Sequence, residues 1–197
     1  MARRTQAQME ETRAVLLSTA RDYFCRFGYA ETSMDDLTAS ADLTRGALYH
    51  HFGDKKGLLA AVVEQIDTEM NDRLYAITHG SLDIWASFCQ RCYAYLEMAL
   101  EPEYQRIVLR DAKAVLGETL AKSNLRCIEQ VEKIITQLID QKYIADVNPR
   151  ALSLLINGGL SEAACWIAEG NSDRRLNQSI ETVNILLSGL LIAKPMD

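Results

Sequence analysis

Apolar side chains recur every three or four residues along almost the whole chain, a spacing that predicts amphipathic helices. In the first sixty residues this pattern predicts three helices, the first of which ends at Gly28. Thr32 or Ser33 caps a short second helix, and Thr44 caps the third. The tight connection at residues 42–43 gives these two helices the spacing of a helix-turn-helix. The side chains expected to face inward are Leu16, Ala20, Tyr23, Phe24 and Phe27 of the first helix and Met34, Leu37 and Ala41 of the second.

Longer helices with the same period follow. A fourth helix, from Leu59 to about Leu74, is expected to link two parts of the chain, with a boundary at residues 79–81. No strand-like alternation interrupts the pattern. Further helices are predicted over residues 85–102, 125–139, 149–170 and from Ser172 or Asp173 to 191, with a less regular stretch over 104–116. The chain is therefore expected to be all-α, with a helix-turn-helix domain over residues 1–56, a linking helix to about residue 78, and a helical ligand-binding and dimerisation domain over 79–197.

Charge is divided unevenly between these two parts. The chain of 197 residues has 21 Lys and Arg against 27 Asp and Glu, a net charge of −6. Residues 1–60 contain eight of each sign, so the whole negative excess lies after residue 60. The cations of the first part cluster at Arg3 and Arg4, at Arg45 and at Lys55 and Lys56. Because local placement matters more than net charge for phosphate binding, this division favours two domains of which the first meets an anionic partner.

The apolar share of 48% predicts a folded core rather than disorder. No apolar run approaches the 18 or more residues that span a bilayer, and the start of the chain is polar rather than signal-like. We therefore expect a cytoplasmic protein with no membrane partner.

The segment from Leu43 to Lys56, LTRGALYHHFGDKK, carries the densest chemical signal. After the Thr44 cap, Leu48 and Phe52 share one helix face, which leaves Arg45, Tyr49 and His50 to point outward. Gly53 suits a left-handed helix end, and Asp54 caps the next helix. Lys55 and Lys56 then lie in a first helical turn, where cations are disfavoured unless an anion such as phosphate binds at the helix N-terminus.

This segment resembles the recognition-helix region of TetR-family transcriptional repressors. Their usual pattern is a capping Ser or Thr, a basic or small residue, Gly, then Leu-Tyr-(His/Tyr)-(His/Tyr)-Phe and a Lys. The likeness extends from about Thr12 to Ile66, and beyond that it rests on helix order alone. It implies a homodimeric repressor that occupies a palindromic operator in double-stranded DNA and is released by a small-molecule effector.

Phosphate contacts position such a protein, and contacts to base edges specify the sequence. Tyr49 has the length to lay its ring against a sugar and offer its hydroxyl to a phosphate, and His50 has the same reach or contacts a base edge. Thr44 and Arg45 are the candidates for base edges, since arginine can bind guanine with two hydrogen bonds. Positions that match DNA-contacting residues of the family are Ser33, Thr44, Arg45, Gly46, Tyr49, His50 and Lys55, with Gly46 allowing close approach of the backbone. Arg3 and Arg4 form either an arm in the minor groove or a disordered tail.

The resemblance also implies dimerisation through the last two helices of each subunit. Small residues at Gly158 and Gly159 permit close helix approach, and the last helix is apolar on more than one side. Burial within one subunit is the alternative. The candidate interface residues are Leu160, Ala164, Ile167, Val183, Leu187 and Leu190.

The resemblance also implies a small-molecule pocket in the middle helices. Binding of a ligand there would change the spacing of the two DNA-binding domains of the dimer. Ordinary core packing is the alternative for each candidate. Arg110 and Asp111 either meet a polar group of the ligand or form a surface pair. The candidate lining residues are Trp85, Phe88, Cys89, Cys92, Tyr93, Tyr104, Ile107, Cys127 and Trp166.

Other classes of function receive less support. Cys89 and Cys92 have CxxC spacing, but no second pair completes a tetrahedral metal site, so we predict no metal and no cofactor. A regulator that senses redox state or metal through this pair remains the alternative. The chain has no G-x-S-x-G, no HExxH and no glycine-rich phosphate loop, which argues against an enzyme. An adaptor that no longer binds DNA is disfavoured because the Thr44–Lys55 face is complete.

Overall fold

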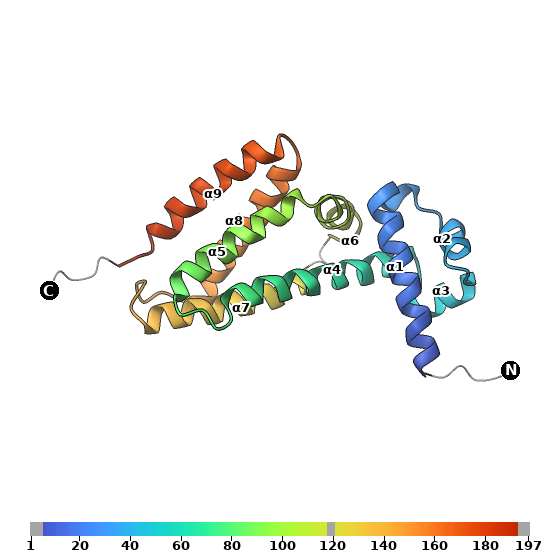
Figure 1. Cartoon of the computed structure of the whole chain (residues 1–197), viewed down its shortest axis with the longest axis horizontal. Helices are drawn as coiled ribbons and strands as arrows, with labels where there is room; N and C mark the ends of the chain where they lie inside the picture. The colour runs from blue at the N-terminus through green and yellow to red at the C-terminus, as the bar shows by residue number, and fades with distance from the viewer. Residues whose placement is uncertain (1–5, 118–120, 193–197) are drawn as a thin grey trace. The chain divides into compact units, whose positions relative to one another are not determined.

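The computed structural model describes residues 6–117 and 121–192, with the side chains of 121–124 excepted, and confirms the all-α prediction (Figure 1). An isolated β-bridge joins Ile144 and Leu191. Arg3 and Arg4 lie outside the described residues. The helices are α1 (Gln6–Glu31), α2 (Met34–Ser40), α3 (Arg45–Phe52), α4 (Lys55–Thr78), α5 (Ile84–Glu97), the 3₁₀-helix η1 (Met98–Leu100), the π-helix η2 (Tyr104–Ala112), α6 (Lys113–Leu116), α7 (Ala121–Asp140), α8 (Pro149–Ala168) and α9 (Ser172–Ser188).

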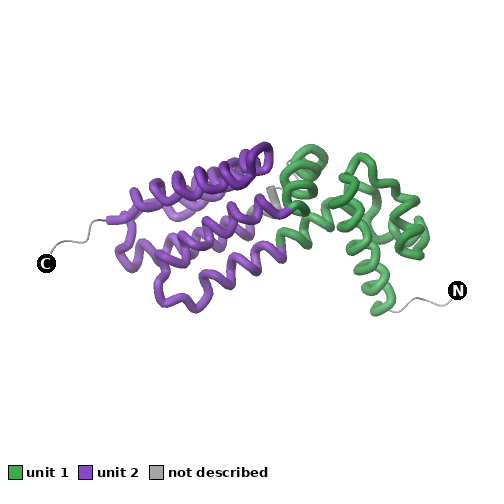
Figure 2. The backbone as a smooth tube through the Cα atoms, turned by 45° about the horizontal axis from the view of Figure 1, so that its top comes forward, with its two compact units in different colours: residues 1–67, 102–120 green, residues 68–101, 121–197 purple. Residues whose placement is uncertain are grey.

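Two compact units divide the chain (Figure 2). Unit 1 comprises residues 1–67 and 102–120, and unit 2 comprises residues 68–101 and 121–197. The chain thus passes from one unit to the other within α4 and returns for η2 and α6. This division by packing differs from the functional boundary expected near residue 78, which stays a prediction.

The core of unit 1 forms where α1, α2 and α3 pack together, and α1 also packs against η2. Leu16 and Phe24 of α1, Leu37 of α2 and Leu48 of α3 are fully buried. Phe27 is instead exposed, although it was predicted to face inward. The helical path is broken at the next residue, where Gly28 has φ +81° and ψ 167°, and a Cβ there would collide with the Arg106 guanidinium. The buried apolar stripe of α1 therefore ends at Phe24, and Phe27 packs edge-on against Tyr23 on the surface.

Local capping chemistry explains where most helices begin and end. Ser33, one of the two predicted candidates, caps α2, and Thr44 caps α3 as predicted. Gly53 adopts φ +76°, and Asp54 Oδ1 accepts from the N–H of Gly57 at 2.6 Å, so the predicted stop and restart between α3 and α4 are confirmed. The prediction for α9 was one or two residues late. Asn171 is the cap, and its side chain accepts from the N–H of Arg174 at 3.1 Å.

Unit 2 is built from the second part of α4 and from α5, η1, α7, α8 and α9. Its core is formed by the inward faces of these helices, with Phe88 and Leu96 of α5 and Ile135 and Leu138 of α7 fully buried. The region predicted to be less regular is the π-helix η2, followed by the single turn α6, and it belongs to unit 1. A π-helix has a wider turn than an α-helix and is rare, so the sequence pattern did not identify it.

By length and composition, α8 is long and apolar enough to cross a membrane, although no single apolar run suggested it. Buried polar side chains at Ser153 and Asn157 lie on its inward face. Such a helix is also what packing against other helices requires, so length and composition alone are weak support for a membrane span.

Candidate DNA-binding site and effector region

Several side chains on the outward face of α3 are exposed and do not take part in core packing. Leu48 is fully buried and anchors the helix, whereas Arg45, Tyr49 and His50 are exposed. Tyr49 keeps 49% of its surface, and within residues 6–117 and 121–192 its hydroxyl has no hydrogen-bond partner. The predicted inward and outward faces of this helix are therefore confirmed for these four residues, with Phe52 half-buried.

The start of α3 leaves room for an approaching surface. The Thr44 hydroxyl accepts from the N–H of Ala47 at 3.2 Å, which leaves its hydrogen free to donate outward. Gly46 is exposed, and a Cβ at this position would meet nothing nearer than the Thr44 hydroxyl oxygen at 3.8 Å. Packing within the protein therefore does not require a glycine here.

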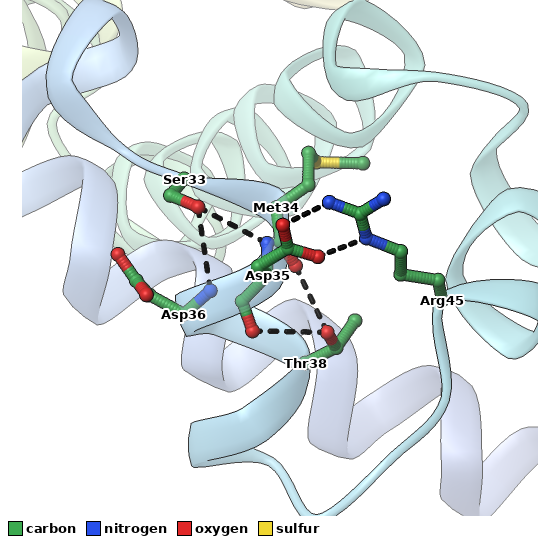
Figure 3. A network of polar contacts seen from close by, with 6 residues as sticks. All are labelled: Ser33, Met34, Asp35, Asp36, Thr38 and Arg45. Carbon is green, nitrogen blue, oxygen red and sulfur yellow. Dashed lines mark hydrogen bonds and ion pairs between the residues drawn. The ribbon is translucent and has the colours of Figure 1, made fainter.

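Arg45 does not extend freely into solvent. Its Nε and Nη2 bind the two carboxylate oxygens of Asp35 in the first turn of α2 (Figure 3). Ser33, the predicted phosphate contact on α2, uses its hydroxyl to accept from the N–H groups of Asp35 and Asp36 at 3.2 and 3.4 Å. Two of the predicted contacts, Ser33 and Arg45, thus belong to one polar network between α2 and α3.

Lys55 was expected to offer its ammonium to a DNA phosphate, but the ammonium contacts groups of α1 instead. Its side chain is half-buried, its ammonium donates to the carbonyl of Ala30 at 3.2 Å, and it lies 4.5 Å from the centre of the Tyr29 ring. Burial lowers the pKa of Lys55, against the opposing charges of Glu31 and Asp111. The neighbouring Lys56 is exposed. Of the two lysines, Lys56 is the one whose charge faces solvent.

In unit 2, the predicted pocket residues do not form one group. Phe88, Cys92 and Cys127 are buried in the interior, and Trp85 is half-buried with its ring 6.2 Å from that of Phe88. Tyr93 is half-buried and donates to Asn184 Oδ1 of α9 at 3.0 Å. These side chains, with Cys89, remain candidates for the pocket.

The other three pocket candidates lie elsewhere. Tyr104 and Ile107 are buried in unit 1, on η2. Trp166 is exposed on α8, where the Arg175 guanidinium covers its ring at 4.8 Å. Periodicity places a side chain on a helix face but does not say which neighbour covers that face, and this is why the sequence grouped the nine together.

An open groove of about 490 Å³ runs between α8 and α9. Leu155 and Leu186, which line it, keep 74% and 66% of their surface. Of the predicted interface residues, Leu160, Val183, Leu187 and Leu190 line this groove. Ala164 and Ile167 are fully buried within unit 2 and offer no surface to a partner. The groove lining is completed by Leu152, Ile156, Gly159, Ala163, Trp166, Gln178, Ser179 and Thr182.

Two family profiles match the chain, one over the helix-turn-helix region and the other over the helices that follow it. The profile of bacterial regulatory proteins of the tetR family matches residues 16–62, and the profile of the tetracyclin repressor-like C-terminal domain matches residues 85–190, more than half of the chain. This chain belongs to the TetR family. It is a transcriptional regulator with a helix-turn-helix DNA-binding domain, in a family of regulators that bind DNA rather than act as enzymes, many of them repressors.

Solved and curated relatives agree with this assignment. A crystal structure of a TetR-family transcriptional regulator from Pectobacterium atrosepticum is 61% identical, has a TM-score of 0.90, and is matched over 96% of this chain and 99% of that one. The Transposon Tn10 TetC protein of Escherichia coli is 28% identical over 159 residues, 78% of each chain. The HTH-type transcriptional regulator AcrR of Shigella flexneri is 26% identical over 206 residues, 98% of this chain and 95% of that protein.

In this TetR-family protein, side chains of η2 form hydrogen bonds to the backbone near the C-terminal end of α1, within unit 1. Arg106 donates to the carbonyl of Phe27 at 2.8 Å, and Asp111 accepts from the N–H of Tyr29 at 2.6 Å. These bonds satisfy backbone groups that the break at Gly28 would otherwise leave unpaired. The role of Asp111 is therefore structural contact with α1, neither of the two roles expected from the sequence. Its partner lies 82 residues away, so no local signal could identify it.

Sequence reasoning also missed Arg91, although a signal was present. Arg91 lies on the inward face of α5, and only 2% of its surface is exposed. The buried Phe88 lies three residues before it, and the buried Cys92 and Tyr95 lie one and four residues after it. Its Nη2 donates to Gln130 Oε1 at 3.0 Å and contacts Cys127 Sγ at 3.6 Å. Its Nη1 has no hydrogen-bond partner and no carboxylate pairs with it among the residues that the structure describes. Burying a cation without a counter-ion is costly.

The CxxC pair of this TetR-family protein does not have the features of a sensor. Burial raises the pKa of Cys89 and raises that of Cys92 to about 12, with nearby negative charge as a smaller cause. Protonated thiols are poor nucleophiles and poor metal ligands. Within the described part of the chain, no cluster of three His, Cys, Asp or Glu residues could hold a metal ion. The structure gives the redox- or metal-sensing alternative no support.

Proposed function

We propose that this protein is a homodimeric repressor that occupies a palindromic operator in double-stranded DNA and leaves it when a small-molecule effector binds. The observation that carries the proposal is the outward face of α3. Tyr49 and His50 lie on it exposed, opposite the fully buried Leu48, and the Tyr49 hydroxyl has no partner within the described residues. An α-helix of this kind fits the major groove, where base edges can be distinguished. Binding to chromosomal DNA places its action in the cytoplasm.

Within that face, the predicted contacts divide into two groups. Tyr49 and His50 are free to contact phosphate and sugar, and Thr44, Arg45 and Gly46 lie at the helix N-terminus, where base edges are reached first. Ser33 contributes from the start of α2. Because the ammonium of Lys55 is held by Ala30 and Tyr29, we propose that Lys56 supplies the phosphate contact at the start of α4 in addition to Lys55 or in its place.

The groove between α8 and α9 supports the homodimer. A contiguous apolar surface of this kind, with Leu155 and Leu186 largely exposed, is normally covered by a partner. Gly158 and Gly159 lie exposed on α8 with open space around them, which allows a second helix to approach closely. We therefore propose Val183, Leu190, Leu155 and Leu186 as interface residues, together with Leu160 and Leu187, which are nearly buried but line the groove. Ala164 and Ile167 are fully buried, do not line it and are left out.

The buried Arg91 supports an effector with an anionic group. A ligand carboxylate beside Arg91 would satisfy the unpartnered Nη1 and neutralise the buried charge, which neither Gln130 nor Cys127 can do. Phe88, Cys92 and Cys127 are buried in the same interior and would supply the apolar part of a pocket that forms around the ligand. An effector releases DNA only if it binds the non-binding dimer geometry more tightly, by a few kcal/mol.

Operator binding is tested by selecting duplex DNA from a random pool and measuring its affinity by fluorescence anisotropy across a salt series. We expect an enriched palindrome, bound by a dimer, with affinity that falls steeply as salt rises because phosphate contacts release counter-ions. Failure to enrich any sequence, both for protein as purified and after ligand-free refolding, would contradict the repressor assignment.

The effector class is tested by thermal unfolding with matched pairs of small molecules, benzoate against benzamide and decanoate against decanamide. We expect the carboxylates to raise the unfolding temperature and the amides to leave it unchanged, because ligands that bind the folded state stabilise it by mass action. Arg91→Gln should abolish the difference. Equal effects of acid and amide on the wild-type protein would rule out an anionic effector of this kind.

A further inference from the structure

Asp35 and Arg45 form a forked ion pair between the two helices of the helix-turn-helix. The Nε of Arg45 binds one carboxylate oxygen of Asp35 and the Nη2 binds the other (Figure 3). Both side chains are more than half exposed, at 57% and 58%. An exposed pair contributes only about 0–1 kcal/mol to folding, so stability does not explain its presence.

The carboxylate of Asp35 is carried by an anchored backbone. The N–H of Asp35 donates to the Ser33 hydroxyl at 3.2 Å, and its carbonyl accepts from the buried Thr38 hydroxyl at 3.1 Å. Asp35 also lies in the first turn of α2, where the helix dipole favours a negative charge. Asp35 is therefore held in place by its backbone, and its carboxylate orders the longer and more flexible side chain of Arg45.

The pair occupies one edge of the guanidinium and leaves the other edge open. Nε and Nη2 are taken by Asp35, which leaves the N–H groups of Nη1 and the second N–H of Nη2, directed away from the pair. Those donors form the end of the planar fork, which matches the O6 and N7 acceptors of guanine in the major groove. Holding the plane in place before DNA arrives reduces the side-chain entropy that base recognition would otherwise cost.

The same carboxylate acts against indiscriminate binding. With one edge of Arg45 occupied, the arginine cannot clamp a phosphate through that edge, and the negative charge of Asp35 repels the backbone of any DNA. The occupied edge weakens binding to random DNA more than binding to a site with the matching base, whereas the repulsion weakens both to a similar extent.

We propose that Asp35 is a specificity-determining positioning residue, which holds Arg45 in the orientation that reads one guanine and suppresses its contacts to phosphate. The inference rests on the proposed function, since it requires that α3 reads an operator.

The test compares Asp35→Asn with Asp36→Asn. Asp36 lies in the same helical turn, is exposed, and also donates its N–H to Ser33, but its carboxylate has no partner in the described part of the chain. Both variants lose one negative charge at the same helix end. Dissociation constants are measured for the selected operator, for the operator with each single base-pair change, and for a random duplex of equal length.

For Asp36→Asn we expect both affinities to rise by a similar factor, with the ratio of operator to random binding changed less than twofold. For Asp35→Asn we expect this ratio to fall about tenfold, with the loss of discrimination confined to one G·C position. In an Arg45→Ala background, Asp35→Asn should alter the ratio no more than Asp36→Asn does. Thermal unfolding of both single variants should match wild type, which excludes misfolding as the cause.

The outcomes separate the two ideas. A wild-type protein that discriminates, combined with an Asp35→Asn variant whose ratio matches that of Asp36→Asn, overturns the role of Asp35 and leaves the repressor assignment intact. A wild-type protein that binds all duplexes equally overturns the repressor assignment and this inference with it. Loss of discrimination at several base pairs in Asp35→Asn would also overturn the inference, because Arg45 reads one position.

Discussion

Ionisable side chains have different surroundings in two regions of the molecule. On the surface of α2 and α3 they are exposed and paired, whereas on the inward faces of α4 and α5 they are removed from solvent. On the surface, Arg45 is exposed and pairs with the carboxylate of Asp35. On α5, Arg91 is buried and one of its nitrogens has no partner within the described residues. On α4, burial raises the pKa of Asp67 to about 7, with the nearby Glu64 charge adding to the effect. The exposed pair costs folding little and is proposed to serve DNA binding, whereas burial of charge at Arg91 and Asp67 opposes folding.

This difference predicts that changes on the inward faces alter stability and that changes on the α3 face alter DNA binding. The largest effect should come from Phe88→Ala in the interior of unit 2. Phe88 is fully buried, so its truncation should lower the free energy of unfolding by about 3–5 kcal/mol. Urea unfolding followed by circular dichroism, at matched protein concentration, measures this. The control is Leu82→Ala, since Leu82 is fully exposed, and a Phe88→Ala loss no greater than the control would break the comparison.

Asp67 should make stability depend on pH. Its pKa in the folded protein lies above its ordinary value of 3.8, so the folded state binds a proton that the unfolded state has already released. Its contribution is therefore full below pH 4 and is lost as the pH rises towards 7. Asp67→Asn should be more stable than wild type at pH 7, by on the order of 2 kcal/mol, and equally stable at pH 4.

The measurement is the free energy of unfolding at both pH values, with Asp72→Asn on the exposed side of α4 as the control. If the difference between Asp67→Asn and wild type did not change between pH 4 and pH 7, the burial argument for Asp67 would be wrong.

On the α3 face, Arg45→Ala should leave the free energy of unfolding within about 0.5 kcal/mol of wild type. It should lower operator affinity and relax the preference at one base position by roughly 1–3 kcal/mol. Arg26→Ala is the control, because Arg26 is also an exposed arginine paired with an aspartate, Asp22. Equal losses on operator and random DNA for Arg45→Ala would refute its base-reading role.

The smallest effect is expected for Tyr49→Ala. Removing a contact to phosphate and sugar should weaken binding to all sequences by about 1 kcal/mol without changing the preference. The control is Tyr75→Ala, whose tyrosine is exposed to a similar extent at a position outside the helix-turn-helix. A loss of sequence preference in Tyr49→Ala would move this residue from the positioning group to the base-reading group.

Several features were predictable because they depend on neighbours in sequence. The caps at Ser33, Thr44 and Asp54 and the left-handed Gly53 follow from bonds spanning two or three residues. The outward face of α3 follows from helical geometry once Leu48 is placed inside. Where local chemistry offered two choices, as at Ser172 and Asp173, the prediction missed the cap by one residue or more, because Asn171 competes with the same geometry.

The sequence by itself determined the all-α class, the helix-turn-helix and the family resemblance, because helical period and capping are short-range properties. Only the tertiary structure decided which partner each exposed or buried group meets. It joined Arg45 to Asp35, Lys55 to Ala30 and Asp111 to Tyr29. It also separated Trp166 from the other pocket candidates and buried Arg91 without a carboxylate among the described residues. These outcomes depend on contacts between helices distant in sequence, and the periodicity of one helix carries no information about the side chains of another.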